Sequence, residues 1–120
     1  MIMDKNAEGV LAEYQAGKYL EEKGYKIIAR NLNYPKIGEL DIVARDGKYL
    51  VIVEVKYRST GEFGYPIEAV TKSKIKKILK ATERFLLTYK EDYSGVRFDV
   101  ISIQDGIIEH IPSAFYGYWN

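Results

Sequence analysis

The sequence predicts a mixed α/β domain whose secondary-structure elements follow the order αβββαββ. Two stretches repeat apolar residues at helical spacing. Five short segments rich in Val, Ile, Tyr and Phe are separated by Gly, Asp or Pro, which is typical of strands and turns. With 120 residues, 47% of them hydrophobic and 29% charged, the composition is that of an ordinary globular protein. We therefore expect one domain, residues 1–120, in which at least two helices flank a mixed central β-sheet.

The first half of the chain predicts a helix, a strand and a hairpin. The helix covers residues 6–23, and Gly24 is its expected stop. Its apolar side consists of Val10, Tyr14, Gly17 and Leu20. A strand follows at 25–33. Segments 38–45 and 48–58 are expected to form a hairpin, because a two-residue Asp46-Gly47 turn between β-rich runs is a strong hairpin signal.

The second half predicts a loop, a helix and two strands. The loop at 59–66 contains three turn-forming residues, and the helix begins at Ile67 or Thr71 and ends at Tyr89. The apolar face of this helix consists of Ile75, Ile78, Leu79, Thr82, Phe85 and Leu86. Strands are expected at 96–103 and 107–111, with Pro112 ending the last one.

Composition excludes several classes of site. The chain has no Cys and one His, which excludes disulfides, cysteine zinc sites and multi-histidine metal clusters. The formal net charge of +1 argues against a histone-like polycation. The first ten residues lack the pattern of a signal peptide, and no apolar run is long enough for a membrane span. We expect a cytoplasmic protein that does not enter membranes.

Charged residues lie on one face of the predicted hairpin. Since side chains alternate along a strand, Glu39 and Asp41 share a face of the first strand, and Glu54 and Lys56 share the facing side of the second. The predicted turn places Glu39 opposite Glu54, with Asp41 diagonal to it. Two interpretations stay open. Either the carboxylates hold a divalent cation, or this face ends at the rim of the sheet, where Lys56 and Arg58 neutralise the acids in water.

The first helix adds a further carboxylate. Glu13 lies on the arc of the helix that is expected to pack against the sheet, beside Gly17. One interpretation is that Glu13 caps a neighbouring backbone group or pairs with Arg58 or Arg97. The other is that it leans over the acidic face of the hairpin.

The acidic residues and the lysine resemble a known nuclease signature. The arrangement is similar to the PD-(D/E)XK pattern, because Asp41 is followed after twelve residues by Glu54-Val55-Lys56. The runs Gly38-Glu39-Leu40-Asp41 and Glu54-Val55-Lys56-Tyr57-Arg58 most resemble the YraN-type family of bacterial proteins, which is distantly similar to archaeal Holliday-junction resolvases. Glu13, Lys74 and Arg97-Phe98-Asp99 fit the same family. Leu40 departs from the general signature, in which many members have Pro.

The resemblance implies a restriction-endonuclease-like fold and a role for each matching residue. Asp41 and Glu54 would be metal ligands, and Glu13 would contribute through the metal or its water. Lys56 would orient or activate the attacking water. Carboxylates are ligands suited to Mg²⁺ or Mn²⁺, and such ions promote phosphodiester hydrolysis. The expected catalytic set is therefore Glu13, Asp41, Glu54 and Lys56.

Basic residues are concentrated in the second helix. Residues 72–84 hold six bases and one acid, a local charge of +5, and Lys72, Lys76, Lys80 and Arg84 recur every four residues. Such a stripe is either the solvated face of an amphipathic helix or a surface for nucleic-acid phosphates. We expect DNA contacts from the stripe together with Lys74 and Arg58.

The sequence thus predicts a magnesium- or manganese-dependent endonuclease that acts on DNA, with branched DNA favoured by the resemblance. The alternatives are a non-catalytic DNA- or RNA-binding module on the same fold, and an unrelated interaction domain, which would leave the acidic face unexplained. A homodimer is compatible with the resemblance, because resolvases act on two strands through two-fold symmetry. Arg97 and Asp99 are expected to form a structural ion pair, and His110 is expected to be structural.

Overall fold

The computed structural model describes residues 5–61 and 64–116, except for the side chains of Lys5, Asn6, Ile67 and Ala69. Its elements are α1 (Lys5–Glu22), β1 (Lys26–Tyr34), β2 (Gly38–Asp46), β3 (Tyr49–Arg58), the 3₁₀ turn η1 (Pro66–Ala69), α2 (Lys72–Thr88), β4 (Gly95–Gln104) and β5 (Ile107–Phe115). The predicted order αβββαββ is confirmed, with η1 as an addition. Gly24, at φ 94°, follows the end of α1 as expected for a helix stop.

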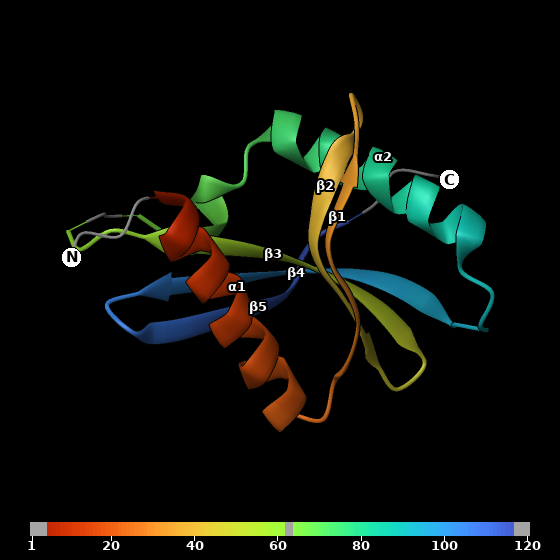
Figure 1. Cartoon of the computed structure of the whole chain (residues 1–120), viewed down its shortest axis with the longest axis horizontal. Coiled ribbons are helices and arrows are strands. Elements are labelled where there is room, and N and C mark those ends of the chain that lie inside the picture. The colour runs from red at the N-terminus through yellow and green to blue at the C-terminus, as the bar shows by residue number, and fades with distance from the viewer. Residues whose placement is uncertain (1–4, 62–63, 117–120) are drawn as a thin grey trace.

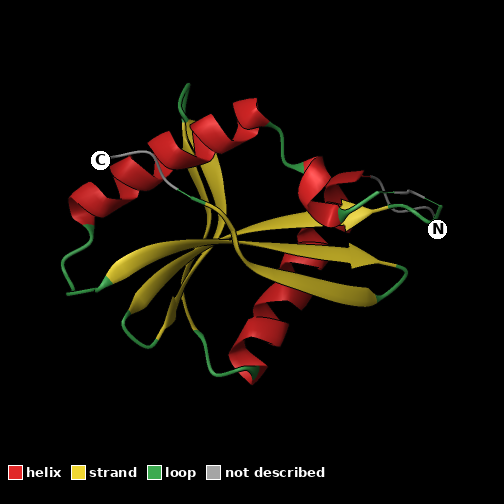
Figure 2. Cartoon of the chain, turned by 180° about the vertical axis from the view of Figure 1, so that it is seen from behind, coloured by secondary structure: helices red, strands yellow, loops and turns green. Residues whose placement is uncertain are grey.

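The five strands form one mixed sheet in the order β1-β2-β3-β4-β5. Only β3 and β4 are parallel among the described strand pairs; the other neighbours are antiparallel. Because parallel neighbours need a crossover, the chain leaves the sheet after β3 and returns through η1 and α2. Figure 1 shows α1 in front of the sheet and α2 beside the β1–β2 hairpin, and Figure 2 shows the same arrangement from behind.

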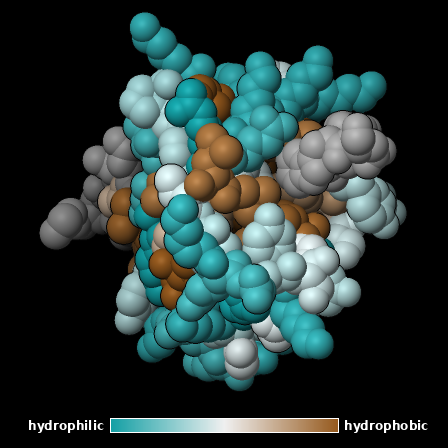
Figure 3. Space-filling model, turned by 90° about the vertical axis from the view of Figure 1, so that its right-hand side faces the viewer, coloured by the Kyte–Doolittle hydropathy of each residue, from teal (hydrophilic) through white to brown (hydrophobic). Residues whose placement is uncertain are grey.

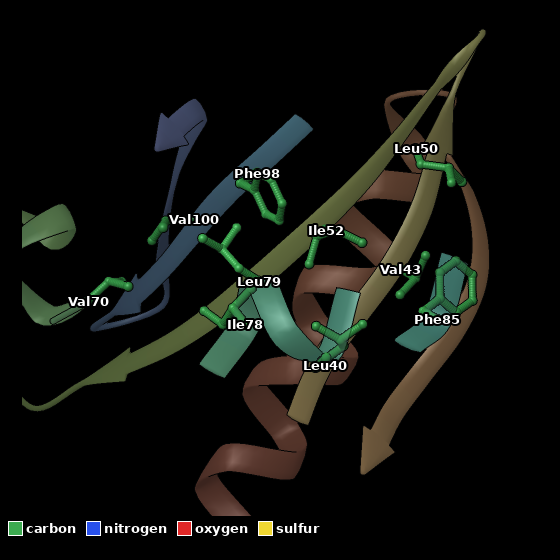
Figure 4. Close-up of a cluster of buried hydrophobic side chains, with 11 residues drawn as sticks. Leu40, Val43, Leu50, Ile52, Val70, Ile78, Leu79, Phe85, Phe98 and Val100 are labelled. Atoms are coloured by element: carbon green, nitrogen blue, oxygen red, sulfur yellow. The ribbon is translucent and has the colours of Figure 1, made fainter. Parts of the chain in front are cut away.

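Buried apolar side chains form two clusters, one on each face of the sheet. The cluster under α2 joins Ile78, Leu79 and Phe85 of the helix to Leu40, Val43, Ile52 and Phe98 of the strands, as Figure 4 shows. The cluster under α1 joins Ala12, Ala16 and Leu20 to Ile42, Val51, Val53 and Ile101. Each cluster removes a continuous apolar surface from water, so both helices are held against the sheet by the hydrophobic effect.

The buried side of α1 differs from the prediction. Gly17 and Leu20 are buried as expected, but Val10 and Tyr14 are 66% and 56% exposed. The side chains in contact with the sheet are instead those of Ala12, Ala16 and Leu20, spaced four residues apart. Two of these are alanines, whose small side chains let the helix lie close to the strands. The larger residues Val10 and Tyr14 are turned toward solvent.

The hairpin turn also lies one residue later than predicted. Asp46 pairs with Tyr49 and Ile42 with Val53, so the two turn residues are Gly47 and Lys48. Gly47, at φ 59°, takes the first turn position, where a type II′ turn places glycine. The register is therefore shifted by two residues, and the predicted opposition of Glu39 and Glu54 is wrong.

The last strand is longer than predicted, because β5 continues through Pro112 to Phe115. As the outermost strand of the sheet, β5 can contain a residue without an N–H without losing a central pairing. An irregular register opposite Phe98 and Val100 and a positive φ of 51° at Ser113 accompany this extension.

The surface seen from the side that lies at the right in Figure 1 is mostly hydrophilic, with hydrophobic surface gathered toward its middle (Figure 3). Within the described ranges, neither helix has the length and apolar content needed to cross a membrane.

Candidate functional site

A cleft of about 720 Å³ opens between the N-terminal half of α1, the β1–β2 hairpin, β3 and the beginning of α2. Its charged lining residues are the acids Glu13, Glu39, Asp41 and Glu54 and the bases Lys36, Lys74 and Lys77. Residues from five elements and one hairpin loop therefore meet in one place, and three of the four predicted catalytic residues are among them.

The cleft begins where β2 and β3 separate. Their backbone pairing ends at Ile42 and Val53, although both strands continue. Beyond this point the Oδ2 atom of Asp41 accepts a hydrogen bond from the backbone N–H of Val55 at 2.9 Å. A side chain thus satisfies a strand donor that lacks its backbone partner, and the carboxylate of Asp41 is held between the diverging strands.

The alternation of side chains along β2 is interrupted at the same point. Leu40 packs in the cluster under α2, whereas Ile42, two residues later, packs under α1. Asp41 lies between them at the junction of the two cores. This position allows its carboxylate to interact both with Glu13 on α1 and with Glu54 on β3.

Gly38 allows α2 to approach the hairpin closely. A Cβ atom at this position would lie 2.7 Å from the backbone oxygen of Lys77, which is too close for any non-glycine residue without a shift of the helix. The glycine therefore helps to set the distance between the hairpin and the cleft-facing side of α2.

Glu54 lies on the floor of the cleft and is only 6% exposed. Burial, followed by the negative charge of Asp41, raises the pKa of Glu54 to about 7, even though Lys74 acts in the opposite direction. The Nζ atom of Lys74 lies 2.6 Å from Oε1 of Glu54. The carboxylate is thus only partly compensated by its one cationic partner among the described residues.

Glu13 reaches the same group of acids from α1. Burial, and then the charge of Asp41, raises the pKa of Glu13, while a hydrogen bond with Asn31 lowers it and Glu39 raises it further. Of the two interpretations that the sequence left open, the structure supports the one in which Glu13 leans over the acidic face of the hairpin.

The two lysines of the site occupy different positions. Lys56, the lysine of the predicted motif, is partly exposed on β3 and does not line the cleft. Lys74 lines the cleft and contacts Glu54 directly. Burial lowers the pKa of Lys74, but the hydrogen bond and the charge of Glu54, with the charges of Asp41 and Glu39, more than offset this and leave it raised.

The donor atoms of the cleft suit a hard divalent cation. Carboxylate oxygens are the ligands that Mg²⁺ and Mn²⁺ prefer. Burial, and then the negative charge of Asp41, raises the pKa of Glu13 and of Glu54, and a bound cation would offset both effects. Within residues 5–61 and 64–116, however, no three Asp, Glu, His or Cys side chains are already arranged as a metal site. The carboxylates are thus chemically suited to a cation, but in this structure Asp41 accepts the N–H of Val55 and Glu54 pairs with Lys74.

The predicted DNA-contacting residues fall into three groups. Lys72, Lys76, Lys80 and Arg84 are all exposed along α2. Lys74 points into the cleft instead. Arg58 is 7% exposed and donates a hydrogen bond to the backbone oxygen of Gly64 at 3.0 Å, so it lies in the interior rather than on an open surface. A DNA contact by Arg58 stays a prediction, and its burial does not favour one.

Lys36 and Lys77 also line the cleft, although the sequence did not single them out as site residues. For Lys77 a signal was available. It lies four residues before Ala81, which is buried, as Lys74 lies four residues before buried Ile78. Residues at this spacing share one side of a helix. Lys36 lies in the loop between β1 and β2, where no periodicity exists to indicate its direction.

A second polar cluster lies away from the cleft, at the junction of β4 and β5. Asp99 accepts two hydrogen bonds from Arg97, at 2.9 Å each, and one from the N–H of Ser113 at 3.0 Å, and lies 2.7 Å from Nε2 of His110. The hydroxyl of Tyr19 lies 3.1 Å from Nδ1 of His110. The predicted Arg97–Asp99 pair is confirmed, and His110, for which the sequence indicated no partner, has two.

Comparison with known proteins adds a family to this geometry. The model of the uncharacterised protein family UPF0102 matches residues 12–103, a range that contains all four predicted catalytic residues. The chain belongs to the UPF0102 family. Membership of the predicted YraN-type family is thereby confirmed. A PD-(D/E)XK affiliation stays a prediction.

UPF0102 relatives match nearly the full length of the chain. A UPF0102 protein of Lachnoclostridium phytofermentans is 43% identical over 117 residues, covering 97% of this chain and 98% of the relative. One from Geobacter metallireducens is 45% identical over 119 residues, covering 96% and 97%. One from Shewanella oneidensis is 44% identical over 107 residues, covering 89% and 97%. Their names assign them to the family and state no activity.

Proposed function

We propose that this UPF0102 protein is a metal-dependent endonuclease that hydrolyses DNA phosphodiester bonds on a restriction-endonuclease-like fold. The observation that carries the proposal is the meeting of Glu13, Asp41 and Glu54, from three different elements, in one cleft bordered by lysines. The resemblance of Asp41 and Glu54-Val55-Lys56 to the PD-(D/E)XK pattern supports the same assignment.

The acidic cluster favours a functional role over a structural one. A buried carboxylate stabilises a fold when cations and donors surround it. For Glu54, burial raises the pKa to about 7, and the negative charge of Asp41 adds to that shift. Such an arrangement lowers the stability of the protein. Acids with shifted pKa values that meet in a cleft are typical of catalytic sites, because such sites keep an arrangement that costs stability when the reaction needs it.

Each residue then has a defined task. The carboxylates of Asp41 and Glu54 would hold Mg²⁺ or Mn²⁺, and Glu13 would orient a ligand of the ion. A bound divalent ion supplies an activated water and neutralises charge that develops on the phosphate. Lys56 does not line the cleft, so its predicted role near the attacking water rests on the resemblance alone. The lysines that line the cleft would attract and orient the phosphate group.

The exposed stripe on α2 provides the extended contact with DNA. Lys72, Lys76, Lys80 and Arg84 lie on the outside of the helix whose first turn borders the cleft. A backbone that follows this stripe would bring one phosphate to the acids. Branched DNA is the substrate structure that the resemblance favours.

The proposal is tested by incubating the protein with linear, single-stranded and four-way-junction DNA in Mg²⁺, Mn²⁺ or EDTA. We expect metal-dependent cleavage that falls about 100-fold or more in Asp41→Asn and Glu54→Gln, because each substitution removes a ligand charge without changing size. Glu109→Gln, an exposed position on β5 outside the cleft, is the matched control and is expected to retain activity.

Absence of metal-dependent cleavage on every substrate, or equal cleavage by the ligand variants, contradicts the proposal. DNA binding without cleavage would identify a non-catalytic binding module. Whether the protein cleaves DNA or only binds it, Lys76→Ala with Lys80→Ala is expected to weaken DNA binding. The same substitutions should reduce the salt dependence of binding by about two counterions, since each lysine contributes about one.

A further inference from the structure

The ammonium group of Lys74 lies against the most buried carboxylate of the cleft. Its Nζ atom lies 2.6 Å from Oε1 of Glu54, and the negative charges of Asp41 and Glu39 also act on it. The side chain of Lys74 is about half exposed, whereas that of Glu54 is almost fully buried. The lysine is therefore the partner that has open space beside it, whereas the carboxylate is enclosed on its strand.

Both carboxylates at the separation of β2 and β3 are already engaged. Asp41 accepts the N–H of Val55, and Glu54 holds Lys74. This engagement is consistent with the absence of a ready-made metal site among the described residues, despite the acids that surround the cleft. A divalent ion that binds Glu54 through the oxygen facing Lys74 must displace the ammonium group.

We propose that Lys74 is an internal counter-ion which competes with the divalent metal for Glu54 and is released into the cleft when the metal binds. The inference rests on the proposed function, because it concerns the metal of the same site. In the metal-free protein Lys74 compensates a buried carboxylate. In the metal-bound protein its ammonium group is free to contact an anionic phosphate in the cleft. Lys74 is then a binding residue whose availability depends on the metal.

The competition has a thermodynamic consequence that is independent of catalysis. If two cations exclude each other at one carboxylate, removal of the internal one strengthens binding of the other. Removal of a lysine elsewhere in the cleft changes the local potential but removes no competitor. Lys77 is a suitable comparison, because it is also exposed, also lines the cleft and comes from the next turn of α2.

The experiment is calorimetric titration of Mn²⁺ into the wild type, Lys74→Met and Lys77→Met, without DNA. We expect Lys74→Met to bind Mn²⁺ about tenfold more tightly than the wild type and Lys77→Met to change the affinity by no more than about twofold. Lys74→Gln, which keeps a polar side chain, replaces Lys74→Met if the latter does not fold. Equal tightening by Lys74→Met and Lys77→Met indicates a general charge effect and overturns the proposal.

The outcomes separate this inference from the proposed function. Unchanged or weaker Mn²⁺ binding by Lys74→Met, with clear binding by the wild type, overturns the competition and leaves the metal site standing. No binding by either protein overturns both. Binding by Lys74→Met alone supports the competition in its strongest form. A metal-induced change in the Lys74 ammonium resonance, absent in Glu54→Gln, is the independent spectroscopic support that we expect.

Discussion

Two buried carboxylates of this protein, Glu54 and Asp99, have opposite electrostatic surroundings. Glu54 is 6% exposed and Asp99 is 0% exposed, so both have lost nearly all their contact with water. Burial raises the pKa of Glu54 to about 7, with Asp41 adding to the effect. Burial also acts to raise the pKa of Asp99, but hydrogen bonds from His110 and Arg97 more than offset it, and that pKa is lowered.

The difference lies in the partners. Asp99 has four hydrogen-bonding contacts within 3.0 Å. Two of them come from Nε and Nη2 of Arg97, whose own pKa is raised by the pairing. Glu54 has one ammonium partner and an acid beside it. A carboxylate that serves the fold is surrounded by donors, whereas one with spare acceptor capacity and a like-charged neighbour is suited to binding a cation.

The largest loss of stability is expected from replacing Asp99, the carboxylate that is surrounded by hydrogen-bond donors. Asp99→Ala leaves Arg97 with less compensation and deprives His110 and Ser113 of their acceptor, so the free energy of unfolding should fall by about 3–5 kcal/mol. Urea denaturation at pH 7 measures this. Glu109→Ala on the exposed side of β5 is the control, with an expected change within about 0.5 kcal/mol. A similarly small loss for Asp99→Ala would show that the surroundings of Asp99 do not stabilise the fold more than those of Glu54.

A substitution at Glu54 is expected to change the free energy of unfolding in the opposite direction. Its raised pKa means that the folded protein binds the proton more tightly than the unfolded chain, so the unfavourable contribution of the charged form is absent below about pH 4.5 and complete above about pH 7. In EDTA, Glu54→Gln should stabilise the protein by on the order of 1–3 kcal/mol at pH 8 and progressively less as the pH falls toward 4.5. A destabilisation of equal size at both pH values contradicts the contrast with Asp99.

The smallest change in stability is expected at Tyr19, which lies at the edge of the polar cluster around Asp99. Tyr19→Phe removes only the hydroxyl that contacts Nδ1 of His110, and should lower the free energy of unfolding by about 1 kcal/mol. The control is Tyr14→Phe, five residues earlier on α1 and exposed, which should have no measurable effect. Equal stability of the two variants would mean that the hydrogen bond at His110 adds nothing to the cluster.

Much of the fold followed from local patterns. The element order, the basic exposed face of α2 and the apolar positions Ile78, Leu79 and Phe85 depend on periodicity, which adjacent residues determine among themselves. The apolar side of α1 could not be predicted equally well. Its sheet-facing residues include Ala12 and Ala16, and the preference for small side chains there arises from how closely the strands approach.

The hairpin register shows a second limit. Shifting the turn by one residue, from Asp46-Gly47 to Gly47-Lys48, changes every cross-strand partner by two positions. Both turns place glycine where a positive φ is tolerated, so local chemistry does not distinguish them. In the observed register Val43 pairs with Ile52, and both side chains are buried in the cluster under α2.

The sequence by itself determined which chemical groups this protein has: three acids that can meet, a lysine two residues beyond one of them, and a charged helix. Only the tertiary structure decided which cation meets which acid. Lys56 is close to Glu54 in the chain but does not line the cleft, whereas Lys74, twenty residues away from Glu54, contacts it. The reason is geometric. The crossover connection brings the first turn of α2 over the point where β2 and β3 separate, and no local pattern in the chain encodes that approach.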